Sequence, residues 1–181
     1  RIYCSPPFIP QGLQNSEVID NSFKLSWLKI IGIDEYEIDV SDNNFTTNLP
    51  NYFNRFTQDT TLVVNGLTAG KIYYCRVRAI NEQGASPNSN PLEVVLKPEK
   101  PLGLTAKPLS INQIQLSWEF NPLAGNTYKL QSAQDSAEVF QDITLVNSNT
   151  YTHSGLKAGT TYYYRLQAFK NGVFSDFSEI V

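Results

Sequence analysis

The sequence predicts an all-β protein made of two antiparallel β-sandwiches in tandem. The first observation is an internal repeat: the segment Gly-Leu-Thr-Ala-Gly-Lys-Ile-Tyr-Tyr-Cys-Arg-Val-Arg-Ala at residues 66–79 recurs in similar form at 155–168, as Gly-Leu-Lys-Ala-Gly-Thr-Thr-Tyr-Tyr-Tyr-Arg-Leu-Gln-Ala. The second observation is that Leu-Ser-Trp at 25–27 recurs at 116–118. A period of about 90 residues is too long for a solenoid repeat and fits one small domain, so the chain divides into two copies.

Short segments of alternating apolar and polar residues are the third observation. Phe23, Leu25 and Trp27 share one face of a predicted strand, and the alternation returns at 36–40, 61–64 and 73–79. Clusters of Gly, Asn, Asp and Pro separate these segments, which is typical of an antiparallel sandwich. No window has helical periodicity over ten residues. The second copy repeats the plan at 114–118, 127–130, 139–145, 151–152 and 162–168.

The boundary between the copies is predicted at a proline-containing stretch. Pro98 and Pro101 each fix φ and lack a backbone donor, so we expect a short, stiff and extended connection. The expected organisation is a lead-in from a preceding segment, two domains and a linker, at 1–5, 6–97 (first domain), 98–100 (linker) and 101–181 (second domain). Because the sequence starts at Arg1 without a signal-like segment, we expect a piece of a longer protein.

Composition excludes several classes of partner. The net charge is −3, and no basic cluster is available to neutralise phosphates, so we expect no nucleic-acid binding and no attraction to an anionic membrane. No apolar run reaches the roughly 20 residues that span a bilayer, so we expect no membrane insertion. Two cysteines are too few for a disulfide scaffold and cannot alone form a zinc site.

Several ordered markers resemble the fibronectin type III family. They are a Trp that closes the second strand, a Leu-x-Ala-Gly-x-x-Tyr turn, a Tyr-x-x-x-Val-x-Ala strand and the polar loop at 81–90, and the set covers both copies. The resemblance implies two immunoglobulin-like sandwiches. The wording Ala-Gly-Thr-Thr-Tyr-Tyr-Tyr-Arg further resembles modules of large secreted or surface proteins of bacteria. The loop at 81–90 has no Arg-Gly-Asp sequence, so integrin recognition does not transfer.

The resemblance implies structural roles for four aromatic residues. Tyr73 and Tyr162 occupy the tyrosine-corner position, where the hydroxyl bonds to backbone a few residues upstream. Trp27 and Trp118 are expected to fill the space between the sheets. The same fold places the N-terminus far from the start of the sixth strand, so we expect no disulfide between Cys4 and an inward-facing Cys75.

Catalytic and metal-binding patterns are weak in this sequence. The only histidine, His153, is not accompanied by a nucleophile elbow, a phosphate loop or a His-x-x-His pair, and we expect an exposed strand or turn histidine. No catalytic residue and no cofactor are predicted. Glu37 and Asp39 should point outward together. They could form a calcium site completed by Asp34 or Asp42, but we favour a solvated strand face because no Asp-x-Asp-x-Asp-Gly loop is present.

The best functional hint is an aromatic insertion at 45–56 in the first copy, which the second copy lacks. Tyr52, Phe53, Arg55 and Phe56 could form a stacking platform for a sugar or a protein. The simpler interpretation is that these rings cap the open side of the first sandwich. Within this segment, Asn44-Phe45-Thr46 matches an N-glycosylation sequon, which would stay unused in a bacterial protein.

The leading hypothesis is a non-catalytic spacer and interaction module of a larger extracellular or cell-surface protein. Its expected partners are other domains of the same polypeptide and a protein or polysaccharide ligand, and we expect a monomer. One alternative is an adhesion or polysaccharide-binding module. Another is a pair of accessory domains of a secreted glycoside hydrolase or protease.

Overall fold

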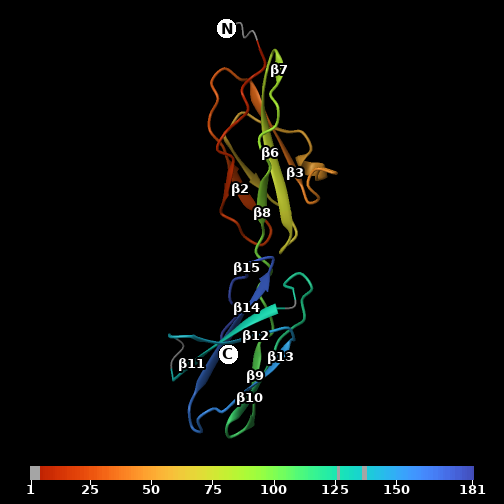
Figure 1. Cartoon of the computed structure of the whole chain (residues 1–181). Helices are drawn as coiled ribbons and strands as arrows, with labels where there is room; N and C mark the ends of the chain where they lie inside the picture. The colour runs from red at the N-terminus through yellow and green to blue at the C-terminus, as the bar shows by residue number, and fades with distance from the viewer. Residues whose placement is uncertain (1–4, 126, 136–137) are drawn as a thin grey trace. The chain divides into compact units, whose positions relative to one another are not determined.

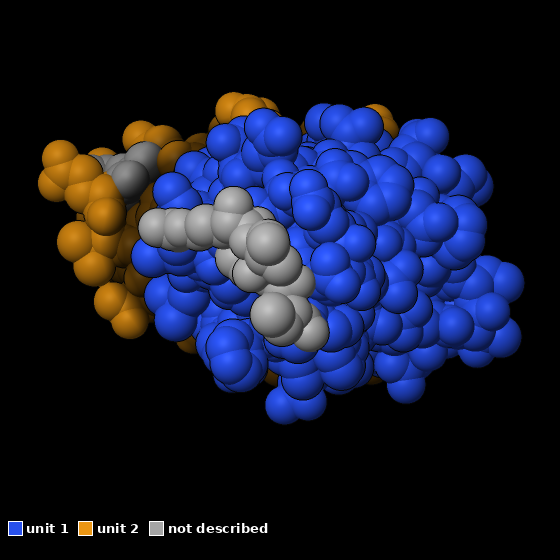
Figure 2. Space-filling model, turned by 90° about the horizontal axis from the view of Figure 1, so that it is seen from above, with its two compact units in different colours: residues 1–96 blue, residues 97–181 orange. Residues whose placement is uncertain are grey.

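The computed structural model describes residues 5–125, 127–135 and 138–181 and contains strands and one short 3-10 turn (Figure 1). The chain divides into unit 1, Arg1–Leu96, and unit 2, Lys97–Val181, which Figure 2 shows in different colours. Each unit has two antiparallel sheets, so the predicted all-β tandem sandwich is confirmed. No helix among the described residues has the length and apolar character to cross a bilayer.

Unit 1 is built on a three-stranded and a five-stranded sheet. Its elements are β1 (Gln14–Ser16), β2 (Phe23–Ser26), β3 (Glu35–Ser41), the 3-10 turn η1 (Pro50–Tyr52), β4 (Arg55–Thr57), β5 (Thr61–Val64), β6 (Ile72–Asn81), β7 (Gly84–Ala85) and β8 (Leu92–Val95). One sheet has the order β1-β2-β5 and the other β4-β3-β6-β7, with β8 also paired to β6. Strand β4 is therefore an edge strand, next to β3 only.

Unit 2 repeats this plan with fewer strands. Its elements are β9 (Thr105–Ser110), β10 (Gln113–Ser117), β11 (Thr127–Gln134), β12 (Gln141–Val146), β13 (Thr150–Ser154), β14 (Tyr162–Lys170) and β15 (Val173–Phe174). The sheets have the orders β13-β10-β9 and β12-β11-β14-β15. The repeated sequence segment therefore ends in the same strand of each unit, β6 and β14.

A tryptophan lies in each core, in the same surroundings. The ring of Trp27 meets that of Tyr36 edge to face, with centroids 5.4 Å apart and an interplanar angle of 70°. Trp118 and Tyr128 are 5.3 Å apart at 70°. All four side chains are buried. Edge-to-face geometry suits the ring quadrupoles, so this pair is a local packing unit that the duplication preserved.

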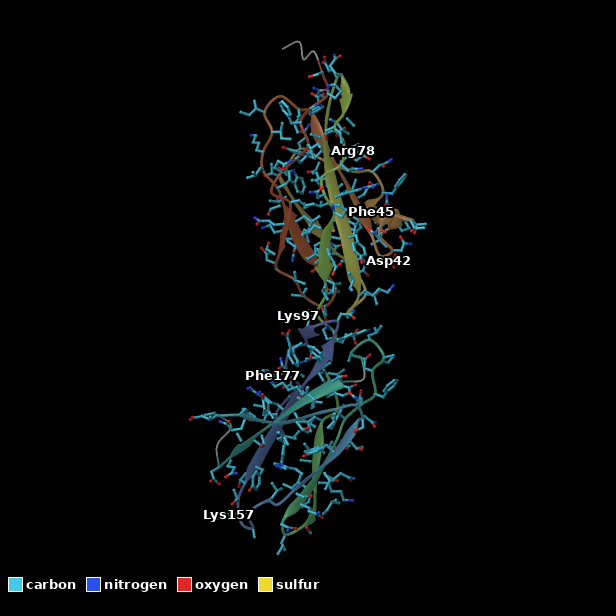
Figure 3. The ribbon with its side chains drawn as sticks, viewed as in Figure 1. Asp42, Phe45, Arg78, Lys97, Lys157 and Phe177 are labelled. Atoms are coloured by element: carbon cyan, nitrogen blue, oxygen red, sulfur yellow. The ribbon has the colours of Figure 1, made fainter. Side chains whose placement is uncertain are left out.

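The corner tyrosines close the turn before β6 and β14. The hydroxyl of Tyr73 accepts a hydrogen bond from the backbone N–H of Thr68 at 2.9 Å. The hydroxyl of Tyr162 accepts one from the N–H of Lys157, also at 2.9 Å (Figure 3 labels Lys157). Tyr73 is buried, whereas Tyr162 is half-buried. The same bond should therefore contribute more to unit 1, where water cannot replace it.

Two serines in each unit attach the last segment to the sheet through their side chains. In unit 1, Ser86 and Ser89 donate their N–H groups to the carbonyls of Ala79 and Val77, each at 2.8 Å. Their hydroxyls in turn accept the N–H groups of the same two residues at 3.0 and 3.1 Å. The bonds recur every third residue, which is the period of polyproline II and not of a strand. Sequence reasoning took this region for a loop.

The equivalent serines of unit 2 do the same against β14. Ser175 bonds both ways with the backbone of Ala168, and Ser178 with that of Leu166. All four serines are buried. The Ser-x-x-Ser spacing is visible in the sequence at both places, so it is a signal that sequence analysis could have used.

Unit 2 contains a half-buried cluster of aromatic side chains around His153. The imidazole Nδ1 lies 3.2 Å from the hydroxyl oxygen of Tyr164, and the rings of Tyr151 and Tyr162 lie 6.2 and 6.3 Å from the imidazole. Burial lowers the pKa of His153 and raises the pKa of Tyr164 to about 12. The prediction of an exposed histidine is wrong, because alternation along β13 turns His153 inward with Tyr151.

Replacing the corner tyrosine Tyr73 by Phe should destabilise unit 1. The ring packing is kept, but the N–H of Thr68 loses its acceptor, and we expect a loss of about 1–3 kcal/mol. Tyr162→Phe should cost less, because water reaches that site. Urea unfolding of both variants measures the difference. An unchanged midpoint for Tyr73→Phe would mean that this hydroxyl does not hold the turn.

Removing one serine hydroxyl should have a similar effect on the segment that follows β7. Ser89→Ala leaves the buried N–H of Val77 without an acceptor, so we expect a loss of about 1–3 kcal/mol in the free energy of unfolding. Ser16→Ala, at an exposed position of β1, is the matched control and should stay within about 0.5 kcal/mol. Equal stabilities of the two variants would contradict the role assigned to the serine.

The stability of unit 2 should fall in mildly acidic solution. Because folding lowers the pKa of His153, its contribution is complete above the ordinary pKa of about 6.5 and is lost as the pH falls through the lower value of the folded state. Trp27→Phe leaves Trp118 as the only tryptophan, so fluorescence then reports unit 2. We expect its urea midpoint to fall between pH 7.5 and 5.5, and adding His153→Gln should flatten this dependence. A dependence that survives the second substitution would exclude His153 as its source.

Candidate functional site on unit 1

The outer face of the β3–β6 sheet is the first place where unit 1 departs from expectation. Glu37 and Asp39 point outward, as alternation predicts, but they are only 4% and 6% exposed. The expectation of a solvated strand face is therefore wrong. Strand β3 is buried on both faces, which is unusual for the outer side of a small sandwich.

Each of these carboxylates is paired with an arginine directly opposite it on β6. Arg78 forms a fork on Glu37, with Nη2 to Oε1 at 2.7 Å and Nε to Oε2 at 2.9 Å. Arg76 bonds Oδ2 of Asp39 through Nε at 2.9 Å and Nη2 at 2.8 Å. The hydrogen bond to Glu37 raises the pKa of Arg78. Register explains the pairs, because Glu37 faces Arg78 and Asp39 faces Arg76 in the ladder.

The segment at 42–54 folds back over this face and covers it. The guanidinium of Arg76 lies 4.3 Å from the ring centroid of Phe45, and the N–H of Asn54 donates to Oδ1 of Asp39 at 3.3 Å. Figure 3 shows Phe45 and Arg78 on the same side of unit 1. Among the described residues no group of three or more His, Cys, Asp or Glu could hold a metal ion. Of the carboxylates considered as calcium ligands, Glu37 and Asp39 are engaged by arginines, and Asp42 forms an ion pair with Lys71.

Tyr52 is buried, unlike the other three predicted partner-binding residues. It is part of the hydrophobic core, and its hydroxyl accepts the N–H of Asn65 at 2.8 Å. The ring thus bridges from η1 to the end of β5, across the open side of the sandwich. This is the capping role that was weighed against a binding role.

Phe53, Arg55 and Phe56 remain on the surface at the edge strand. Phe53 is 62% and Phe56 46% exposed, and Arg55 is exposed as well. Phe56 pairs with Glu37 in register and so belongs to the outer face, whereas Arg55 pairs with Ile38 and points the other way. There Arg55 lines a shallow hollow of about 220 Å³ together with Leu62 and Val63. The three side chains therefore surround one edge of the sandwich and do not form one flat platform.

Sequence reasoning missed a second apolar surface in unit 1. Phe8 is 87% and Ile31 81% exposed, and both line one hollow with Pro6 and Pro7. The signal was present, because an apolar run at 30–31 directly precedes the Gly32 turn. Exposed apolar side chains that are grouped around one hollow are a candidate surface for contact with another molecule or domain.

Unit 2 stabilises the corresponding face with different side chains. Arg165 lies between the rings of Phe140 and Phe177, 4.0 and 3.7 Å from their centroids (Figure 3 labels Phe177). Its Nε donates to the side-chain oxygen of Gln131 at 2.8 Å. Hydrogen bonds from Lys129 and Gln131 lower the pKa of Asp142. One of these rings, Phe140, comes from the connection between β11 and β12, which is the counterpart of the 42–54 segment, and the other, Phe177, follows β15.

Two reactive side chains among the described residues, Cys75 and His153, lie in surroundings that bear on their chemistry. Burial raises the pKa of the Cys75 thiol to about 12, so the thiolate nucleophile is suppressed. Cys75 is free, and the predicted absence of a bond to Cys4 concerns a residue outside those that the structure describes. The partner of His153 is a phenol that stays protonated. The Cys75 thiol is therefore not a nucleophile in this state, and His153 is hydrogen-bonded to a phenol and not to a carboxylate.

Known proteins resemble the chain in sequence and in fold. Human neogenin is 33% identical over 117 residues, which are 60% of this chain and 8% of neogenin. The tyrosine-protein phosphatase Lar-like of Caenorhabditis elegans is 29% identical over 124 residues, 64% of this chain and 6% of that protein. The chain thus spans less than a tenth of these relatives. Both are animal proteins, so the resemblance to bacterial modules in particular is not supported.

A solved structure has the same fold, and a family model matches both units. The two-domain fibronectin type III segment of chicken tenascin superposes with a TM-score of 0.62 at 16% identity, over 95% of this chain and 98% of that one. The fibronectin type III domain model matches residues 8–95 and 99–181. Because these matches cover nearly the whole chain, the chain belongs to the fibronectin type III family and carries two of its domains.

Proposed function

We propose that the chain is a non-catalytic spacer and interaction module of a larger extracellular or cell-surface protein. Three observations support this: two domains of one interaction-type family in tandem, relatives that match over 6% and 8% of their length, and buried or protonated reactive groups. Its partners are other domains of the same polypeptide and a protein ligand, and the chain acts as a monomer.

The observation that carries the interaction role is the exposed aromatic edge of unit 1. Phe53 and Phe56 expose large apolar rings, and the charged Arg55 is exposed on the opposite side of β4 from Phe56. Aromatic residues and arginine are enriched in the centres of protein interfaces, where rings add contact area at small entropic cost. Since Tyr52 already closes the core, these rings are not needed to cap it.

The apolar loop surface supports the spacer role. Phe8 and Ile31 expose more apolar area than a solvated loop requires, and a neighbouring domain would remove that area from water. About 25 cal/mol per Å² of buried apolar surface would favour such a contact. The edge and the loop surface thus suit two different partners of one module.

There are two alternative functions, of which one would use the same aromatic edge of unit 1 and the other would not use it. Exposed rings also stack on sugar rings, so a polysaccharide-binding adhesion module would use Phe53 and Phe56 as well. Accessory domains of a secreted glycoside hydrolase or protease would carry the catalytic residues in another part of their polypeptide. Binding specificity separates the first alternative from the proposal, and the neighbouring sequence separates the second.

The proposal can be tested with the immobilised chain and a panel of purified animal ectodomains, with a glycan array in parallel. We expect binding to a protein, weakened at least tenfold by Phe53→Ser with Phe56→Ser. A tenfold change corresponds to about 1.4 kcal/mol, a normal contribution for an aromatic contact. The matched control is Leu109→Ser with Ile111→Ser, because these unit 2 residues are also exposed apolar side chains.

Each other outcome assigns the function differently. Equal protein binding by both variants would remove the β4 edge from the interface. Binding to glycans alone would replace the protein-interaction role by the polysaccharide alternative. A chain that binds neither class would keep only the spacer role.

A further inference from the structure

The sequence contains one N-glycosylation sequon, Asn44-Phe45-Thr46. A sequon requires an asparagine followed, after one residue other than proline, by Ser or Thr, and it is used where the asparagine is on the surface of a protein that passes through the secretory pathway. The relatives found for this chain are animal proteins. In animal proteins of the secretory pathway a sequon can be glycosylated, whereas in most bacterial proteins it is not used.

The sequon lies at the tip of a tight turn. Asn44 and Phe45 are its two central residues, with φ of +52° and +63°, and the N–H of Thr46 bonds the carbonyl of Asn43 at 3.4 Å. Two positive φ values are typical of a type I′ turn, in which asparagine is favoured at the first central position. Asn44 is exposed, and Figure 3 shows the turn's Phe45 at the side of unit 1.

Hydrogen bonds to the side chain of Ser41 stabilise this turn. The buried Ser41 hydroxyl donates to the Thr47 carbonyl at 2.6 Å and accepts the N–H groups of Asn43 and Phe45 at 3.2 and 3.0 Å. The Phe45 ring packs on Arg76. A positive φ is energetically unfavourable for a phenylalanine. The surrounding contacts therefore stabilise a backbone conformation that this residue rarely adopts.

The same contacts leave the acceptor amide available. Neighbouring Asn43 uses its side chain internally, since its Nδ2 donates to Thr47 Oγ1 at 2.7 Å and its Oδ1 accepts from Thr47 N–H at 3.0 Å. No such bond is recorded for the side chain of Asn44 within the described part of the chain. Of the two adjacent asparagines, the one in the sequon is therefore the one that faces solvent unengaged.

We propose that Asn44 is N-glycosylated. In the transfer, a bond forms between Nδ2 of Asn44 and C1 of the first sugar of a lipid-pyrophosphate-linked oligosaccharide. The bond from C1 to the pyrophosphate oxygen breaks, the lipid pyrophosphate leaves, and the amide nitrogen gives up one proton. The assignment rests on the extracellular location proposed above, because the donor and its transferase belong to the secretory pathway.

A glycan at this position would lie beside the candidate binding surface. Phe45 and Asn54 both contact the Asp39–Arg76 pair, so the sequon turn and the segment that carries Phe53 share one support. The sugar would shield the outer face at this end of β3 and leave the opposite side of the edge, near Arg55, accessible. Glycosylation would thus restrict the direction from which a protein partner approaches.

The test uses the whole chain, secreted from cultured animal cells behind a heterologous signal peptide. We expect peptide N-glycosidase to increase its gel mobility and convert residue 44 to aspartate, detected by mass spectrometry. Asn44→Gln and Thr46→Ala should both abolish the shift, whereas Thr46→Ser and the control Asn51→Gln should keep it. Thr46→Ala retains Asn44 in the turn, so it remains informative if glutamine is poorly tolerated there.

Different results would contradict the glycosylation site and the proposed extracellular location. A secreted wild-type chain without a glycosidase shift would overturn the site, whatever the natural location. Modification of the secreted chain together with glycosidase resistance of the protein from its own cells would keep the site and contradict the extracellular location. A shift that persists in Asn44→Gln and in Thr46→Ala would place the glycan elsewhere and overturn the assignment.

Discussion

Unit 1 depends on the two arginine–carboxylate pairs between β3 and β6. Glu37 and Asp39 are nearly inaccessible to water, and such a carboxylate without its partner costs about 3–5 kcal/mol. The pairs neutralise the outer face, which allows the 42–54 segment to lie on it. That segment in turn supplies Tyr52 to the core and places the sequon turn and the exposed rings on the surface. The position of the candidate surface therefore depends on two charge pairs that are not themselves part of it.

Unit 2 shows that the fold does not require this solution. Asp39 and Gln131 occupy the same place opposite an arginine, as the pairings with Arg76 and Arg165 show. With a neutral partner, Arg165 is stabilised by two phenylalanine faces in a cation–π arrangement, one from the short β11–β12 connection and one from the segment after β15. The duplicated framework has thus diverged at its surface while the Trp–Tyr contact in each core stayed nearly constant.

Patterns that recur locally were readable from the sequence, and those that depend on distant partners were not. Strand alternation and the repeat predicted the fold, and alternation placed Glu37 outward correctly. It could not show that the 42–54 segment would return over the neighbouring Asp39–Arg76 pair, because such a contact depends on tertiary packing. Tyr52 and Phe53 are neighbours of the same chemical type, and only the position of β5 decides that one is buried. His153 was misplaced for a simpler reason, since alternation along its strand was visible and was not applied.

The serine bonds that replace strand pairing after β7 have a consequence for how such domains coexist in one polypeptide. A regular edge strand exposes a row of N–H and C=O groups that can recruit a similar strand from a neighbouring copy. Here Ser86 and Ser89 satisfy β6 with a three-residue period, and Pro87 lacks a donor altogether. The outward-facing N–H and C=O groups of this segment therefore do not match the two-residue spacing of an incoming strand. At this segment, strand exchange between tandem domains of similar sequence is therefore disfavoured.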